Sequence, residues 1–171
     1  MNSGAFDDLL TANAVFAAHF ENAGLPARAA RGLAVLTCMD SRINPFDILG
    51  IGPGDAKVLR NAGGRVTEDV LRTLVLGTYL LDVNRVLVMP HTKCAMAGFT
   101  EDEIHAKIGV EHGVDTRSLE FRTTDDQLAS LRHDIVRIES YPLLPADLAV
   151  GGAVFDVDTG RLVPLAPEPN A

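Results

Sequence analysis

Two short apolar runs constrain the fold of this chain most strongly. Residues 33–38 (LAVLTC) and residues 85–89 (RVLVM) have the length of a strand, and their apolar residues are consecutive rather than alternating. Such runs are typical of strands that are buried on both faces of a sheet. Between them, Thr67 is a suitable helix N-cap and is followed by apolar residues at helical spacing. Two buried strands joined by a helix predict a parallel sheet.

The rest of the chain continues this alternation of strands and helices. We expect helices over residues 6–23, 101–111 and 125–140, a strand over 57–60, and closing strands over 153–157 and 162–165. Thr124-x-x-Gln127 matches a capping box at the start of the third of these helices. Asp158-Thr159-Gly160 is a turn signal between the closing strands. We therefore predict one α/β domain over residues 1–171, with a mostly parallel β-sheet flanked by helices and a loose tail over 165–171.

Charge and hydropathy exclude several classes of function. The formal net charge of −8 is opposite to what nucleic acids or anionic membrane surfaces attract, so neither partner is expected. No apolar run reaches the roughly 18 residues of a membrane span, and the acidic start MNSGAFDDLL does not resemble a secretory signal. We expect a cytoplasmic protein, in which the two cysteines stay reduced and serve catalysis or metal binding.

Two short motifs follow the two buried strands directly. Residues 38–42 (CMDSR) end the first strand, and residues 91–94 (HTKC) follow the second. Neighbouring parallel strands lie about 5 Å apart, so Cys38, His91 and Cys94 can converge on one ion. Three ligands of the Cys₂His type leave a fourth position open, which is typical of a catalytic zinc site.

The residues beside Cys38 add to this interpretation. Two thiolates cancel the charge of a zinc ion, so a water molecule at the open position is acidified less than at a site made of histidines. Asp40 is placed to accept a hydrogen bond from that water, and Arg42 can hold Asp40 in a charge-assisted pair. The alternative for these residues is that each cysteine is an inert core residue and that Asp40 and Arg42 form an ordinary loop salt bridge.

Taken together, the two motifs resemble those of the beta-class carbonic anhydrases. Cys38-x-Asp40-Ser41-Arg42, followed by His91-x-x-Cys94 with the cysteines 56 positions apart, is similar to that family's paired motifs. Residues 60–64 (RNAGG) resemble its loop beside the zinc pocket, and residues 153–165 resemble the terminal strands of its short bacterial members. The similarity covers about residues 30–100 together with this closing segment.

The resemblance implies an activity, a cofactor and a set of roles. It implies reversible hydration of carbon dioxide to bicarbonate and a proton by a carbonate dehydratase, a lyase, that works as a homodimer or a multiple of dimers. By position, Cys38, His91 and Cys94 become zinc ligands, and Asp40 and Arg42 become the catalytic pair beside the metal. In some members the aspartate itself ligates zinc, so Asp40 is a possible fourth ligand in a closed state.

The resemblance also assigns a loop of the substrate pocket, and it shows one position at which this chain differs from many family members. Ser41, Gly63 and Gly64 correspond to residues that line the substrate pocket. Many relatives have glycine after the second cysteine, whereas this chain has Ala95. If the backbone at this position needs a positive φ, alanine resists it and the loop must differ.

Several other functions compete with this interpretation. A zinc hydrolase of carbonyl sulfide or carbon disulfide would keep the same ligands, and a non-catalytic zinc-binding module would have Asp40 closing the site. A cysteine phosphatase would need arginine six positions after Cys38, where Asn44 stands. The glycines at positions 50, 52 and 54 do not match the dinucleotide fingerprint, whose third glycine would fall on Asp55.

Overall fold

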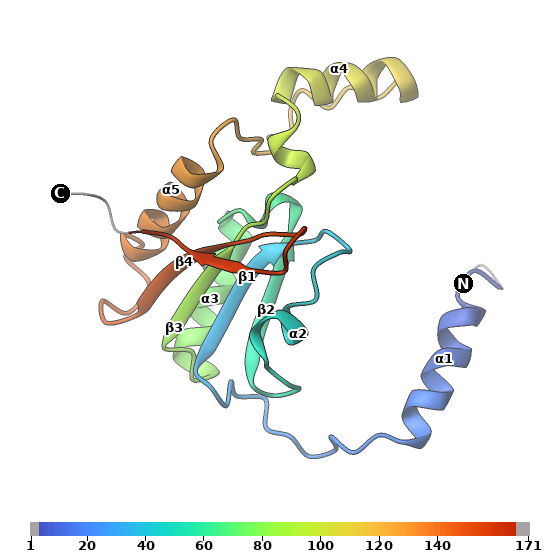
Figure 1. Ribbon diagram of the computed structural model, residues 1–171, viewed down its shortest axis with the longest axis vertical. Helices are drawn as coiled ribbons and strands as arrows, with labels where there is room; N and C mark the ends of the chain where they lie inside the picture. The colour runs from blue at the N-terminus through green and yellow to red at the C-terminus, as the bar shows by residue number, and fades with distance from the viewer. Residues whose placement is uncertain (1–3, 167–171) are drawn as a thin grey trace.

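The computed structural model describes residues 4–166 and contains one five-stranded sheet (Figure 1). The strands are β1 (Leu33–Cys38), β2 (Ala56–Asn61), β3 (Arg85–Met89), β4 (Ala149–Phe155) and β5 (Leu162–Pro164). Their order across the sheet is β2-β1-β3-β4-β5; the first four pair in parallel, and β5 pairs antiparallel with β4. The predicted α/β fold with a mostly parallel sheet is confirmed.

The interior strand β1 is apolar except for Thr37 because both of its faces are covered. Leu36 belongs to a core shared with α3 (Glu68–Leu80) and α5 (Gln127–Glu139). Val35, its neighbour, points the other way into a smaller core beside α2 (Pro45–Leu49). Successive side chains of a strand point to opposite faces, so a strand between two cores cannot alternate with polar residues.

Two further helices stand away from the sheet. α1 (Asp7–Ala18) and α4 (Glu101–His112) extend from the body on long connections, and neither contains a buried residue (Figure 1). α1 confirms the predicted N-terminal helix but ends at Ala18 rather than at residue 23. Large apolar side chains on and around α1 are exposed: Phe6, Leu9, Leu10, Val15, Phe16 and Phe20.

The predicted capping box at the start of α5 is wrong. Asp126 is the N-cap, and its carboxylate accepts a hydrogen bond from the backbone N–H of Ala129 at 2.9 Å. The side chain of Gln127 does not reach back to the cap; it donates to the carbonyl of His91 at 2.7 Å. An intact capping box begins α4 instead, between Thr100 and Glu103.

The closing strands begin and end differently from the prediction. β4 starts at Ala149, four residues before the predicted start. The prediction missed these residues because Gly151 and Gly152 have poor strand propensity. Leu165 donates its N–H to Gly152, and the carbonyl of Ala166 accepts from Arg132, so the chain is still held at these residues. The remainder of the predicted loose tail lies outside the described residues. Within residues 4–166 no helix is long and apolar enough to cross a membrane.

Gly152 is a packing requirement of the fold. A Cβ atom built on Gly152 would lie 2.8 Å from Cδ1 of Ile135 and 3.0 Å from Cδ1 of Leu131, both on α5. The neighbouring Gly151 has nothing within 4 Å of such an atom. The glycine at position 152 therefore allows α5 to approach the sheet closely.

This difference predicts opposite outcomes for two similar substitutions. Gly152→Ala should lower the free energy of unfolding by about 1–3 kcal/mol through overpacking, as measured by urea denaturation. Gly151→Ala is the matched control on the same strand and should leave stability unchanged or raise it slightly. Equal urea midpoints for the two variants would contradict this account of how α5 packs.

Candidate metal centre

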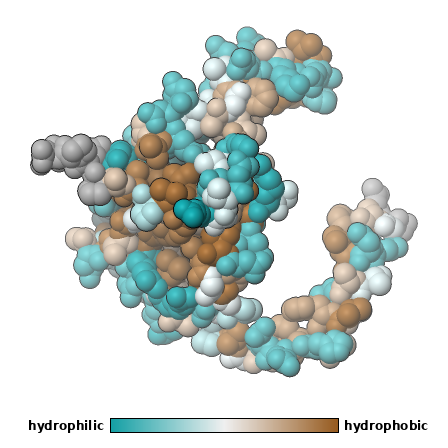
Figure 2. Space-filling view, viewed as in Figure 1, coloured by the Kyte–Doolittle hydropathy of each residue, from teal (hydrophilic) through white to brown (hydrophobic). Residues whose placement is uncertain are grey.

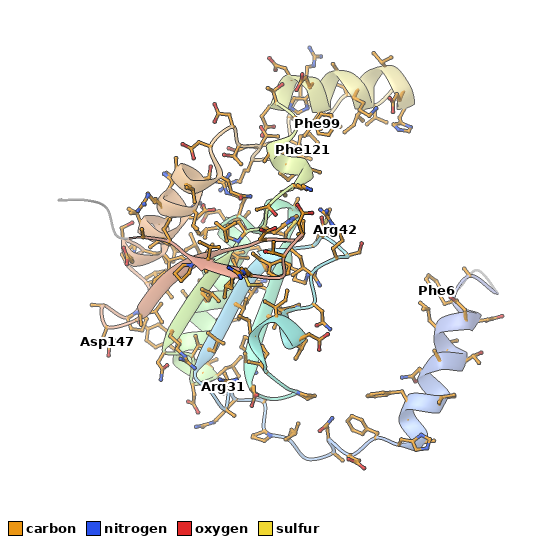
Figure 3. All side chains as sticks on the ribbon, in the orientation of Figure 1. Phe6, Arg31, Arg42, Phe99, Phe121 and Asp147 are labelled. Atoms are coloured by element: carbon orange, nitrogen blue, oxygen red, sulfur yellow. The ribbon has the colours of Figure 1, made fainter. Side chains whose placement is uncertain are left out.

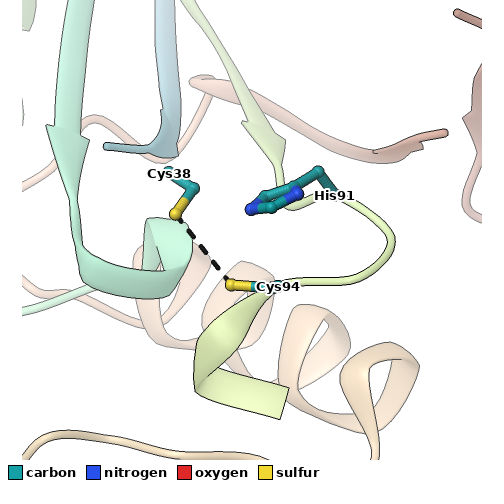
Figure 4. Close-up of side chains that lie close together, drawn as sticks. All are labelled: Cys38, His91 and Cys94. Atoms are coloured by element: carbon teal, nitrogen blue, oxygen red, sulfur yellow. Dashed lines mark hydrogen bonds between the residues drawn. The ribbon is translucent and has the colours of Figure 1, made fainter. Parts of the chain in front are cut away.

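Three metal-ligating side chains converge at the carboxyl ends of β1 and β3 (Figure 4). Cys38 is the last residue of β1, while His91 and Cys94 lie on the loop that follows β3. Their donor atoms all lie within 4.8 Å of one another, and the two Sγ atoms are 3.9 Å apart. All three residues are buried. Within residues 4–166 this is the one such group of histidine, cysteine and carboxylate side chains, as the two motifs predicted.

His91 is oriented as a metal ligand. Its Nδ1 lies 2.9 Å from the carbonyl oxygen of Thr92, so Nδ1 carries the proton and donates it. Its Nε2 is buried and has no hydrogen-bond partner among the described residues. Burial lowers the pKa of His91, which keeps the ring neutral. A buried nitrogen lone pair without a donor is unfavourable, and a bound cation would satisfy it.

The two thiols also fit a cation. Burial raises the pKa of Cys94, and the neighbouring Cys38 raises it further. Two thiolates this close together would repel each other in a site of low polarity, so a divalent ion between them is needed for both to ionise. One imidazole and two thiolates are ligands that Zn²⁺ prefers, and three protein ligands leave the fourth tetrahedral position open.

Asp40 and Arg42 form a tight pair at the edge of this group. Oδ1 of Asp40 accepts hydrogen bonds from the backbone N–H and from Nε of Arg42, both at 2.9 Å, and Oδ2 accepts from Nη2 at 2.7 Å. These bonds from Arg42 hold the pKa of Asp40 well below its usual range. Arg42 also donates to the carbonyl of Lys93 at 3.1 Å, so it joins the two motifs. Figure 3 shows Arg42 at this end of the sheet, with Arg31 at the other.

The same pair of residue types occurs elsewhere in the chain. Asp115 and Arg117 make the same three hydrogen bonds on the surface, so Asp-x-Arg spacing is sufficient for this geometry. What distinguishes Asp40 is its position, because its Oδ2 is 3.8 Å from Nε2 of His91. Both Asp40 oxygens are engaged by Arg42, and Asp40 is not one of the three converging donors.

The predicted pocket loop lies directly beside Cys38. Gly63 and Gly64 form the 3₁₀ turn η1 (Ala62–Gly64) after β2, and both have positive φ. A Cβ atom on Gly64 would lie 3.0 Å from the carbonyl carbon of Thr37, so only glycine allows this approach. Ser41 is exposed, next to the Asp40–Arg42 pair.

Ala95 does not strain its loop. It begins the 3₁₀ turn η2 (Ala95–Ala97), and it is not among the residues with positive φ. The left-handed position of the loop is Lys93, with φ of 55°. The departure from glycine after the second cysteine is therefore accommodated without a left-handed alanine.

Sequence reasoning missed several residues that support the site. Arg60 donates to the carbonyls of Cys38 at 2.9 Å and Asp40 at 2.7 Å, which fixes the backbone of the first motif. Asp134 is 3% exposed and pairs with Nε of Arg65 at 2.7 Å, which ties α5 to the segment after η1. An acidic residue on the apolar face of a predicted helix, such as Asp134, is the signal that could have indicated a buried partner.

Comparisons with known proteins agree with this geometry. The family model that matches residues 33–162 is described as carbonic anhydrase. Beta-carbonic anhydrase 1 of Mycobacterium tuberculosis is 36% identical over 162 residues, which cover 94% of this chain and 98% of that protein. A crystal structure of carbonic anhydrase from Streptococcus mutans superposes with a TM-score of 0.91 at 37% identity, covering 97% of this chain and all of that one. Carbon disulfide hydrolase of Saccharolobus solfataricus is 33% identical over 156 residues, covering 77% of this chain and 76% of that protein.

Proposed function

The chain belongs to the beta-class carbonic anhydrase family, and from this premise we propose how its own residues carry out the family's reaction. That reaction is the reversible hydration of carbon dioxide to bicarbonate and a proton, so the chain is a carbonate dehydratase. The observation that carries this function is the convergence of Cys38, His91 and Cys94 at one end of the sheet.

Zinc is the metal that the donor set favours. Cys38, His91 and Cys94 would hold the ion, with His91 binding through Nε2 because its Nδ1 is already bonded to Thr92. When bound, zinc supplies a Lewis acid that lowers the pKa of a water molecule toward neutral pH.

Asp40 orients the water that reacts. Its low pKa keeps the carboxylate ionised and makes it a weak base, so its role is to accept a hydrogen bond rather than to remove the proton. As the water oxygen adds to the carbon of carbon dioxide, one C=O electron pair moves to oxygen and the proton passes to solvent, which leaves bicarbonate. A fixed acceptor selects the orientation in which a lone pair of the water faces the substrate.

Arg42 keeps Asp40 in that position. Its guanidinium binds both carboxylate oxygens and also the carbonyl of Lys93, so the carboxylate is held between the two ligand loops. This pairing opposes rotation of Asp40 onto the metal, which would close the fourth position. Ser41, Gly63 and Gly64 border the same end of the sheet and are proposed to line the substrate pocket.

Substitution of Asp40 tests its role. Asp40→Asn keeps the size of the side chain but removes the charged acceptor, so kcat/KM for carbon dioxide hydration should fall by about 100-fold in stopped-flow assays of zinc-loaded protein. Asp115→Asn disrupts the matching surface pair and should leave the rate unchanged. Equal rates for Asp40→Asn and the wild type would exclude Asp40 from catalysis.

The same protein preparations show whether carbon dioxide or carbon disulfide is the substrate. Sulfide release from carbon disulfide is measured in parallel, because the similarity to carbon disulfide hydrolases makes this the specific rival activity. We expect rapid hydration of carbon dioxide by the zinc-loaded protein. Sulfide release without hydration would overturn the proposed substrate in favour of the rival.

We also propose that the chain works as a homodimer or a multiple of dimers. α1 carries several exposed apolar side chains and contains no buried residue. Apolar residues gather on the sheet face opposite α3 (Figure 2), where a groove contains Leu33, Leu49, Ile51 and Leu87. Arg31 and Arg85 border this groove, whereas α1 begins with Asp7 and Asp8. A helix from a second copy fits this surface by both hydropathy and charge.

A charge on α1 should break the dimer. Phe16→Glu should convert the protein from at least twice the 18.3 kDa chain mass to the chain mass itself, as measured by light scattering after size exclusion. Leu143→Glu is the control, because Leu143 is equally exposed but lies outside α1. A wild-type protein that elutes as a monomer at micromolar concentration would contradict the proposal.

A further inference from the structure

The loop between His91 and Cys94 is held in a conformation that it would not adopt alone. Only Thr92 and Lys93 separate the two ligands, and Lys93 has a φ of 55°. A non-glycine residue in the left-handed region is unfavourable, and such residues persist where their surroundings determine the backbone. Something outside the loop must therefore supply that stabilisation.

Residues at the end of β4 and just after it form hydrogen bonds with both the backbone and the side chain of Thr92. The N–H of Thr92 donates to the carbonyl of Phe155 at 2.9 Å, and the N–H of Phe155 donates to Pro90 at 2.9 Å. The hydroxyl of Thr92 accepts from the N–H of Val157 at 3.1 Å and donates to Oδ1 of Asp156 at 3.4 Å. Three consecutive residues, 155–157, thus fix one residue of the ligand loop.

Asp156 is itself fixed by the turn that follows β4. Its Oδ1 accepts from the N–H of Asp158 at 2.9 Å, and its Oδ2 accepts from the hydroxyl of Thr159 at 2.9 Å. Its backbone N–H donates to Arg161 at 2.8 Å. The Asp158-Thr159-Gly160 turn therefore orients the carboxylate that faces Thr92.

Thr92 in turn fixes the metal ligand. Its carbonyl oxygen accepts the Nδ1 proton of His91 at 2.9 Å, so the position of Thr92 determines the rotation of the imidazole and the direction of Nε2. Groups that accept the second N–H of a metal-bound histidine orient the ring and tune its affinity for the metal. The hydrogen bonds run continuously from the turn through Asp156 and Thr92 to His91.

We propose that Thr92, anchored by Asp156, is a positioning residue of the metal centre and that the turn after β4 belongs functionally to that centre. The proposal rests on the metal site of the proposed function. Asp158 is assigned no such role, although its carboxylate pairs with Lys93 at 2.6 Å. Both of those side chains are more than half exposed, at 64% and 58%, and solvent screens such a pair.

The test is the affinity for zinc rather than the activity. Thr92→Val removes the hydroxyl with little change of shape and should weaken zinc binding by about 10-fold, measured by competition with a chromophoric chelator. Thr92→Ser keeps the hydroxyl and should restore wild-type affinity. The absorption spectrum of the Co²⁺-substituted protein should change for valine and not for serine.

Matched variants separate positioning from general stability. Thr78→Val removes a hydroxyl that donates to the carbonyl of Val75 at 3.1 Å on α3, and it should leave zinc affinity unchanged. Asp158→Asn should also have no effect, whereas Asp156→Ala should weaken zinc binding as Thr92→Val does. The thermal midpoint of each metal-free variant is recorded beside its affinity.

The outcomes test separately the positioning role of Thr92 and the metal centre itself. Wild-type zinc affinity in Thr92→Val, or a loss matched by Thr78→Val, would overturn the positioning role. A fall in the metal-free thermal midpoint with unchanged zinc affinity would overturn it too, because Thr92 would then serve only the fold. Failure of the wild-type chain to bind zinc would overturn the metal centre itself and the inference with it.

Discussion

The parallel pairing of β1 with β3 is the constraint on which the rest of this structure depends. The register places Thr37 opposite Met89, so both strands end at the same edge of the sheet. The buried hydroxyl of Thr37 donates to the carbonyl of Met89 at 2.7 Å and reinforces the pairing at that point. The next residue of β1 is Cys38, and the other two ligands follow β3. A one-residue slip would turn Cys38 to the opposite face of the sheet and separate the ligands.

The metal centre depends on the balance of charge among its buried groups. The Cys94 thiol, whose pKa is raised by burial, lies beside a second buried thiol and a neutral imidazole, and a bound cation would complete this group. The charged pair Asp40–Arg42 lies at the edge of this group, where solvent still reaches it. In the proposed function, the buried donors would hold the ion and the partly exposed charged pair would position the reacting water.

Much of this organisation could be predicted from the sequence because local patterns encode it. The apolar runs 33–38 and 85–89 gave strands with those bounds, and the motif spacing identified all three ligands. The prediction failed where long-range contacts decide the outcome. The start of β4 was missed because Gly152 does not look like a strand residue. Its glycine is needed for the close packing of α5, and no local sequence pattern shows that contact.

Gln127 illustrates the same limit within the site. Its spacing from Thr124 matched a capping box, yet its amide binds the carbonyl of His91, 36 residues away in sequence. Arg60 and Asp156 likewise act on backbone or side-chain atoms far along the chain. Sequence spacing identifies the residues that could bind the metal, whereas the residues that hydrogen-bond to their loops are found only once the fold brings them together.

The most direct test of the account is anomalous diffraction at the zinc absorption edge from crystals of the zinc-loaded protein. We expect one anomalous peak per chain, within bonding distance of Sγ of Cys38, Nε2 of His91 and Sγ of Cys94. Absence of a peak at this site, or a zinc ion bound by other residues, would contradict it.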